Sequence, residues 1–306
     1  MNYQYYIADV FTDRVFQGAQ IAVFPHAQGL NKDTMQSITK EMNLSETVFI
    51  FKSAEAENHY QIRTFSPQIE LDFSGHPLIA AAWVLASIGD LKLKGEHTPL
   101  IFEQSTGPVE CYVTVDGDQP TLIQFTMPVN SSIDRFVPTD KELTDILSLD
   151  VSELENKKLN PLLVSCGKNY LIIPIRTYSS VRKARFNFKA WSSSSAPSTL
   201  AKKLLLVTPT QGADKSNFHA RIVGPDIGQT EDPPIGSAMP AFAAYLCEHQ
   251  HIKTGTHIFT IDRGTESTRR SQLNIEMDNK PDRLVLRVGG PAVLVSEGLM
   301  TIPNGC

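Results

Sequence analysis

A short polar segment, Ser74-Gly75-His76-Pro77, stands directly before the most apolar stretch of the chain. The residues from Leu78 to Ile88 are apolar on every side apart from Ser87, which is typical of a fully buried helix. The first amides of a helix lack partners within it and carry the positive end of its dipole. The segment therefore predicts an anion-binding site, with a histidine beside it, at the start of a buried helix.

The second half of the chain contains a similar arrangement. Arg63 to Pro67 (RTFSP) precedes a loop and then SGHPLIAAAWVL, while Arg221 to Pro225 (RIVGP) precedes a slightly longer loop and then IGSAMPAFAAYL. The repeated strand end, glycine and Ala-rich helix predict an internal duplication. We expect the starts of both helices to face each other across a cleft suited to a carboxylate or an enolate-like intermediate.

Length and charge limit the classes of protein that fit. The 306 residues suit two domains of roughly 150 residues each. The formal net charge of -5 and the scattered basic residues do not favour nucleic acid as a partner, and the short clusters Arg182–Arg185 and Arg269-Arg270 are expected to be solvated surface. No apolar run approaches the ~18 residues of a membrane span, and the first residues lack a targeting pattern. A cytoplasmic protein without membrane contact is expected.

The cysteines and histidines predict neither disulfides nor a metal site. The four cysteines are far apart and form no CxxC pair, so we expect reduced thiols, with Cys247 packed inside the second helix. His249 and His251 form an HxH, but no further ligand stands nearby in the sequence.

Many short strands and a few helices predict an α+β fold. Asn31 is expected to cap a helix that starts at Lys32, with apolar residues at helical spacing, and Thr139 to cap a second one. The serine-rich segment from Trp191 to Thr199 is expected to be a surface loop.

Several motifs together resemble the PhzF-like phenazine biosynthesis protein family, of the diaminopimelate epimerase-like superfamily. They are DVFTDRVFQG near the start, NLSETVFI at 43–50, FSGHP at 73–77, TGPV at 106–109, EDPPIGSA at 231–238 and GGPAVLVSEG near the end. The resemblance implies two pseudo-symmetric domains, each a β-barrel-like sheet around a central apolar helix, with the active site between them. We expect the first domain at 1–128, completed by the C-terminal strand at 294–306, and the second at 129–293. A homodimer is also implied.

The proton chemistry implied by the resemblance centres on Glu46. Relatives that epimerise amino acids use one cysteine at each helix start, but those positions are Ser74 and Ile235 here, which excludes two-thiol chemistry. In PhzF-type isomerases a glutamate of the NLSET motif is the general acid/base, and it corresponds to Glu46. The residues themselves allow two interpretations of this carboxylate before the apolar VFIF run. It is either a proton-transfer group in a partly desolvated cleft or a solvated group at a strand start.

The other site residues also follow from the resemblance. His76 and Asp232 match groups that orient substrate and relay protons, and Ser237 matches a substrate donor. Ser74 is expected to be a substrate-binding residue, and the backbone amides at Gly75 and Gly236 would hold a substrate carboxylate, since glycine allows close backbone approach. By position alone, the histidine could instead bond to backbone, the serine could be a cap, and the aspartate could be a turn former.

Two departures from the family pattern leave the substrate open. Ala19-Gln20 follows Gly18 where GNP is common, and Pro234-Ile235 replaces a small residue and a threonine. We expect a cofactor-independent isomerase that moves a proton on a small carboxylate-bearing substrate, because no Gly-rich nucleotide fingerprint is present. The alternative is a catalytically silent small-molecule-binding or regulatory protein on the same scaffold.

Overall fold

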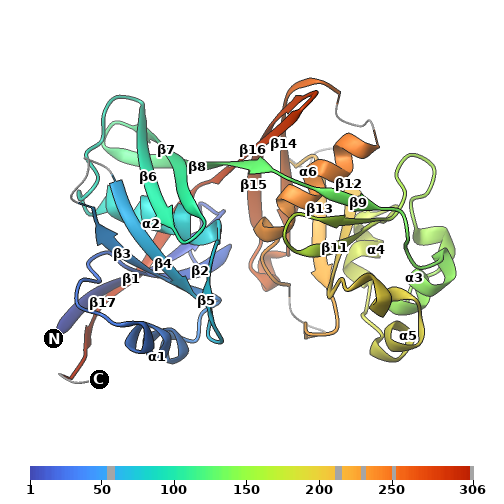
Figure 1. Ribbon diagram of the computed structural model, residues 1–306, viewed down its shortest axis with the longest axis horizontal. Helices are drawn as coiled ribbons and strands as arrows, with labels where there is room; N and C mark the ends of the chain where they lie inside the picture. Colours follow the sequence, from blue (N-terminus) through green and yellow to red (C-terminus); the bar gives the residue numbers. More distant parts are fainter. Residues whose placement is uncertain (54–58, 211–215, 229–231, 250–252, 304–306) are drawn as a thin grey trace. The chain divides into compact units, whose positions relative to one another are not determined.

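The computed structural model describes residues 1–53, 59–210, 216–228, 232–249 and 253–303 (Figure 1). Glu231 of the EDPPIGSA motif, His251 and Cys306 lie outside these ranges. The chain divides into two compact units, Met1–Met127 with Arg287–Cys306, and Pro128–Leu286. The chain returns to the first unit at Arg287, whereas the sequence analysis expected this return at residue 294. The stretch between these positions already bonds to the first unit, since the Phe11 N–H donates to the Pro291 carbonyl at 2.8 Å.

The first unit combines strands with two helices. Its elements are β1 (Asn2–Val10), β2 (Ala19–Phe24), α1 (Lys32–Met42), β3 (Glu46–Lys52), β4 (His59–Phe65), β5 (Glu70–Leu71), α2 (His76–Ser87), β6 (His97–Gln104), β7 (Gly107–Asp116), most of β8 (Gln119–Val129) and β17 (Ala292–Thr301). Strand pairing follows the order β17, β1, β2, β3, β4, β6, β7, β8, with β2–β3 and β4–β6 parallel and the other pairs antiparallel.

Helix α2 packs against strands β17, β1, β2, β3 and β7 of this sheet. Nearly all of its residues are buried, as its uniform apolarity predicts. Helix α1 packs on the other side of β3 and β4, where Met35 and Ile38 meet Phe49 and Phe65. Its N-cap is Asn31, whose side chain accepts the Thr34 N–H at 2.9 Å, which confirms the sequence prediction.

The second unit contains shorter helices among its strands. Its elements are β9 (Ser132–Asp134), α3 (Asp140–Leu147), η1 (Val151–Glu153), β10 (Leu162–Ser165), β11 (Asn169–Pro174), α4 (Tyr178–Lys183), α5 (Phe188–Ser193), η2 (Ala196–Thr199), β12 (Lys203–Pro209), β13 (Phe218–Val223), η3 (Gly236–Ala238), α6 (Met239–Glu248), β14 (Gly255–Arg263), η4 (Glu266–Thr268), β15 (Ser271–Lys280) and the first part of β16 (Arg283–Gly290).

The pairing pattern of the first unit recurs in the second. The pairs β1–β2, β2–β3, β3–β4, β4–β6 and β6–β7 are antiparallel, parallel, antiparallel, parallel and antiparallel. The pairs β10–β11, β11–β12, β12–β13, β13–β14 and β14–β15 follow the same sequence. The two arginines that suggested the duplication, Arg63 and Arg221, lie on the corresponding strands β4 and β13. The repeated topology is the structural counterpart of the repeated motifs.

Helices cover both faces of the second sheet. Helix α6 packs through Phe242 against Phe218 of β13 and Phe259 of β14, with ring centroids 5.2 and 6.2 Å apart. Helices α3, α4 and α5 cover the opposite face, where Leu171, Leu206 and their neighbours form a separate core. Strands buried on both faces explain apolar runs such as KLLLVTP, which do not alternate.

Two sequence expectations about this unit are wrong. The segment from Trp191 to Thr199 is not a surface loop, because it forms the end of α5 and the turn η2, and Ala196 is buried in the core. The Ser195 N–H donates to Glu142 at 2.8 Å, which ties the segment to α3. Nor is Arg182 solvated surface, because it is paired with a buried carboxylate. Among the described residues, no helix has the length and apolarity needed to cross a membrane.

Candidate active-site residues

The first unit brings Glu46 and Ser74 together. Glu46 is the first residue of β3 and is partly exposed, while Ser74 lies just before α2 and is 8% exposed. The Ser74 hydroxyl donates to Oε2 of Glu46 at 2.7 Å. A hydroxyl donor stabilises the ionised form of a carboxyl group, so Glu46 is oriented as a hydrogen-bonded carboxylate that is still reachable from outside.

The start of α2 is held by aromatic packing. Gly75 is the N-cap residue, and a Cβ built at this position would lie 2.4 Å from Cζ of Phe125. Glycine is thus required here by the neighbouring ring, a reason that the sequence does not reveal. His76 begins the helix, is 7% exposed and meets the ring of Phe11 edge-on, with centroids 5.5 Å apart. No side chain in the described part of the chain caps α2 through a hydrogen bond.

The Ser74 backbone has a further partner on β6. Its N–H donates to Oε1 of Gln104, the last residue of the strand, at 3.3 Å. Thus the serine is held through both its backbone and its hydroxyl.

In the second unit, Asp232 is part of a buried ion pair. Its side chain is 2% exposed, and Oδ2 lies 2.5 Å from Nη1 of Arg182 on α4. The backbone carbonyl of Asp232 accepts a hydrogen bond from Arg263. Burial lowers the pKa of Arg263 to about 10, and the negative charge of Asp232 opposes this shift. Asp232 therefore anchors its loop to two arginines, to Arg182 through its carboxylate and to Arg263 through its backbone carbonyl.

Ser237 is exposed and lies in the turn η3, immediately before α6. Its Oγ accepts a hydrogen bond from the hydroxyl of Tyr170 at 2.9 Å. Burial is the main cause that raises the pKa of Tyr170, so the phenol keeps its proton and remains the donor. Because Ser237 accepts from the phenol, its own hydroxyl hydrogen is free to point elsewhere.

The glycine of the second motif is placed differently from that of the first. Gly75 directly precedes α2, whereas Gly236 begins a 3-10 turn and α6 starts only at Met239. Ile235 is 1% exposed and therefore part of the core. The two motifs are similar in sequence but present different backbone geometry.

Comparison with known proteins agrees with the motifs. The sequence model of the phenazine biosynthesis-like protein family (PhzC-PhzF) matches residues 8–298. The chain belongs to this family. An uncharacterized isomerase of Mesorhizobium japonicum is 30% identical over 97% of this chain and 98% of its own. The trans-2,3-dihydro-3-hydroxyanthranilate isomerase of Pseudomonas chlororaphis is 27% identical, covering 98% and 100%.

A solved PhzF-family structure shares the fold of this family member. The phenazine biosynthesis protein of Bacillus anthracis superposes with a TM-score of 0.84 at 22% identity, covering 99% of this chain and 100% of the other. The predicted family and the α+β fold class are thereby confirmed.

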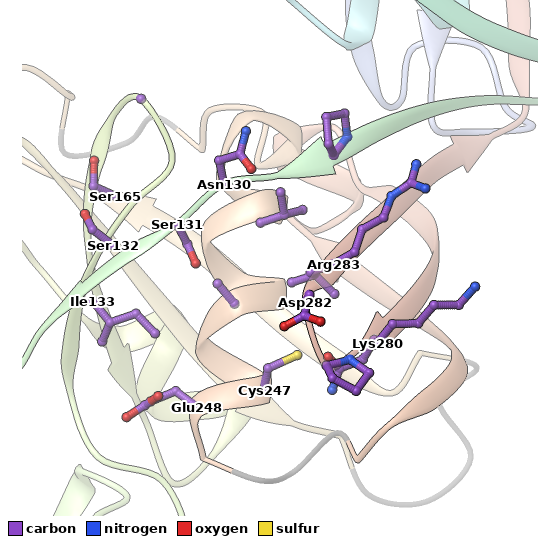
Figure 2. A pocket seen from close by; sticks show the side chains of 17 residues that line it. Asn130, Ser131, Ser132, Ile133, Ser165, Cys247, Glu248, Lys280, Asp282 and Arg283 are labelled. Carbon is purple, nitrogen blue, oxygen red and sulfur yellow. The ribbon is translucent and has the colours of Figure 1, made fainter.

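A cavity of the second unit contains none of the predicted site residues. It measures about 800 Å³ and is lined by the segment from Pro128 to Ile133, the C-terminal half of α6 and the hairpin between β15 and β16 (Figure 2). The thiol of Cys247 points into it, so this cysteine is only partly packed, contrary to expectation. Burial raises the pKa of this thiol, which keeps it protonated. Across the described ranges, no group of three or more His, Cys, Asp or Glu residues could hold a metal ion.

The sequence did not point to four residues that hold the candidate residues of each unit in place. They are Gln104 and Phe125 in the first unit and Tyr170 and Arg182 in the second. Each contacts a motif residue from a distant part of the chain. Only Gln104 has a detectable signal, because it stands two residues before the TGPV motif.

Proposed function

We propose that this family member is a cofactor-independent isomerase that moves a proton on a small carboxylate-bearing substrate. Isomerase activity is the function named for its relatives, including one acting on trans-2,3-dihydro-3-hydroxyanthranilate. The observation that carries the proposal for this chain is the 2.7 Å hydrogen bond from Ser74 to the partly exposed Glu46. It is the arrangement expected of an oriented general base.

In the proposed reaction, the Glu46 carboxylate takes a proton from a carbon atom of the substrate. The electron pair of the broken C–H bond moves into an adjacent conjugated system, and the double bond at its far end shifts. Glu46, now a carboxylic acid, returns the proton to the carbon that has gained electron density. No atom is gained or lost, so the reaction requires no other reagent. The Ser74 hydroxyl favours the carboxylate form at the start and end of this cycle.

The substrate carboxylate is proposed to bind at helix starts. The amide of Gly75 directly precedes α2, and no side chain of the described residues caps the first N–H groups of this helix. The Ser74 N–H already donates to Gln104, so Ser74 would line the binding place beside Glu46 rather than supply its amide. In the second unit, Gly236 and the hydroxyl of Ser237 would act as further donors. A closed barrel around each central helix belongs to the same proposal.

His76 and Asp232 are proposed to orient the reacting groups. The ring of His76 is buried in the first turn of α2, where Phe11 fixes its plane. Asp232 is bound to Arg182, so its proposed role is to hold the loop that leads to Gly236. A proton-relaying role for this carboxylate would require it to separate from the arginine.

Deuterium exchange tests the proposal. The protein is incubated in deuterated water with trans-2,3-dihydro-3-hydroxyanthranilate and a panel of small amino and hydroxy acids, and carbon-bound deuterium is followed by NMR. We expect exchange or isomerisation of at least one compound, with a loss of about 10²- to 10⁴-fold in Glu46→Gln. The matched control is Glu110→Gln, an exposed carboxylate of β7, which keeps full activity.

Two outcomes contradict the proposal. One is exchange that Glu46→Gln leaves unchanged. The other is a compound that binds tightly without exchange or conversion across the whole panel, which supports the silent binding protein instead. Light scattering during size-exclusion chromatography tests the expected homodimer separately, since a monomeric mass contradicts it.

A further inference from the structure

Three neighbouring strands of the first unit present polar side chains on one face. Side chains alternate along a strand, so Glu46 shares a face with Val48, which pairs with Thr64 on β4. Tyr60 lies on that same face of β4 and pairs with Phe102, which places Gln104 of β6 there too. Glu46, Thr64 and Gln104 therefore share one face of β3, β4 and β6.

The carboxamide of Gln104 is fixed at one end only. Its Oε1 accepts a hydrogen bond from the Ser74 N–H at 3.3 Å. Because an N–H can donate only to the oxygen of the carboxamide, Oε1 and not Nε2 faces Ser74. The other end, Nε2, is buried without a hydrogen-bond partner among the described residues. An unpaired buried donor destabilises a fold, so an apolar side chain would fill this place at lower cost. A residue kept here at that cost indicates a role beyond packing.

The segment before α2 is clamped from two sides. Gln104 holds the backbone of Ser74, and the ring of Phe125 lies against the α-carbon of Gly75. The serine hydroxyl reaches Glu46 at 2.7 Å from this clamped backbone. A chain of contacts thus runs from the Gln104 carboxamide, through the Ser74 backbone and hydroxyl, to the Glu46 carboxylate.

We propose that Gln104 is the positioning residue of this site, which fixes the Ser74 backbone so that the serine hydroxyl donates to Glu46. It touches no reacting atom and acts through the serine. Its catalytic consequence rests on the proposed role of Glu46, but its effect on the Glu46 carboxylate can be measured without any substrate.

The test is an NMR titration of the Glu46 carboxyl carbon in protein labelled at glutamate Cδ, with the signal assigned by its loss in Glu46→Gln. Gln104→Met removes the acceptor and keeps the length of the side chain. We expect it to move the titration midpoint of Glu46 upward by up to about 1 pH unit, because the carboxylate loses an oriented donor. Gln61→Met is the matched control. Gln61 is exposed on the opposite face of β4, and this change leaves the midpoint in place.

A double-mutant cycle separates action through Ser74 from a general structural effect. Ser74→Ala removes the hydroxyl and is expected to raise the midpoint at least as much as Gln104→Met. When both changes are present, the midpoint should equal that of Ser74→Ala alone, because no hydroxyl remains to be positioned. Shifts that add together, or a Gln104→Met midpoint equal to that of the wild type, overturn the proposal.

Kinetics provide a second readout once a substrate is known. Gln104→Met should lower kcat about 10-fold with little change in KM, and move the acid limb of the pH–rate profile upward. A protein without isomerase activity but with the expected midpoints refutes the proposed function and leaves the positioning role supported. An active protein in which the midpoint shifts of the two substitutions add together supports the proposed function and refutes the positioning role.

Discussion

Replacing Arg182 by methionine leaves the carboxylate of Asp232 buried without its close cation. The Asp232 side chain is 2% exposed and Arg182 is 19% exposed, at an N–O distance of 2.5 Å. Removing one partner of a buried ion pair costs about 3–5 kcal/mol, because the remaining charge has lost both its water and its partner. Since water reaches the arginine end, we expect the lower end of this range, about 3 kcal/mol, for Arg182→Met.

The assay is urea unfolding followed by tryptophan fluorescence. The chain has two tryptophans, and Trp191 packs against the core of the second unit. With Trp83→Phe as background, the remaining signal reports the unit that holds the ion pair. Lys183→Met is the matched control on the same helix, because Lys183 is 59% exposed in its pair with Glu153 and such pairs contribute about 0–1 kcal/mol.

A second substitution shows whether the charge is the cause. Adding Asp232→Asn to Arg182→Met removes the unpaired charge, so most of the lost stability should return. A loss below about 1 kcal/mol for Arg182→Met, or a double variant no more stable than the single one, refutes the reasoning from burial.

Three further changes probe the first unit. Gly75→Ala should lower the stability by about 1–3 kcal/mol, because the new Cβ would lie 2.4 Å from Cζ of Phe125. Adding Phe125→Leu should restore part of the lost stability, as measured by thermal unfolding. Glu70→Gln should cost about 0.5–1 kcal/mol at neutral pH. The hydrogen bond from Arg63 holds the pKa of Glu70 low, so the stability that Glu70 contributes is present above its pKa in the unfolded chain and is lost as the pH falls through its pKa in the folded protein. If the wild type remains more stable than Glu70→Gln by the same amount below about pH 4, this reasoning is wrong. Asn31→Ala should cost about 1 kcal/mol, measured by urea unfolding, and no loss would mean that the Asn31 cap is dispensable.

The prediction of two buried apolar helices, α2 and α6, succeeded because their signal is local. A stretch that is apolar on every side can only be a buried helix, and α2 is one. The caps Asn31 and Thr139 were predictable for the same reason, since a cap bonds to an amide only a few residues away. The duplication was visible because both copies kept a strand end, a glycine and an Ala-rich helix.

The errors concern residues whose partners are distant in sequence. Arg182 looked like solvated surface within a run of basic residues, yet its partner Asp232 lies 50 positions later. The serine-rich segment after Trp191 looked like a loop, but Glu142 of α3 accepts hydrogen bonds from Ser195 and ties the segment down. The composition of such a segment predicts only the environment that is usual for it. Whether the segment is buried in this protein depends on a contact with a residue far away in the sequence.

By itself, the sequence determined the family, the α+β class, the buried helices and the candidate residues Glu46 and Ser74, because each depends on a short motif or a local periodicity. Only the tertiary structure showed that the Ser74 hydroxyl reaches Glu46 and that Gln104 holds the serine from behind. These contacts join β3, the start of α2 and β6, and no pattern in the sequence encodes which side chains meet when strands pair. The orientation of the proposed base is therefore a property of the folded sheet.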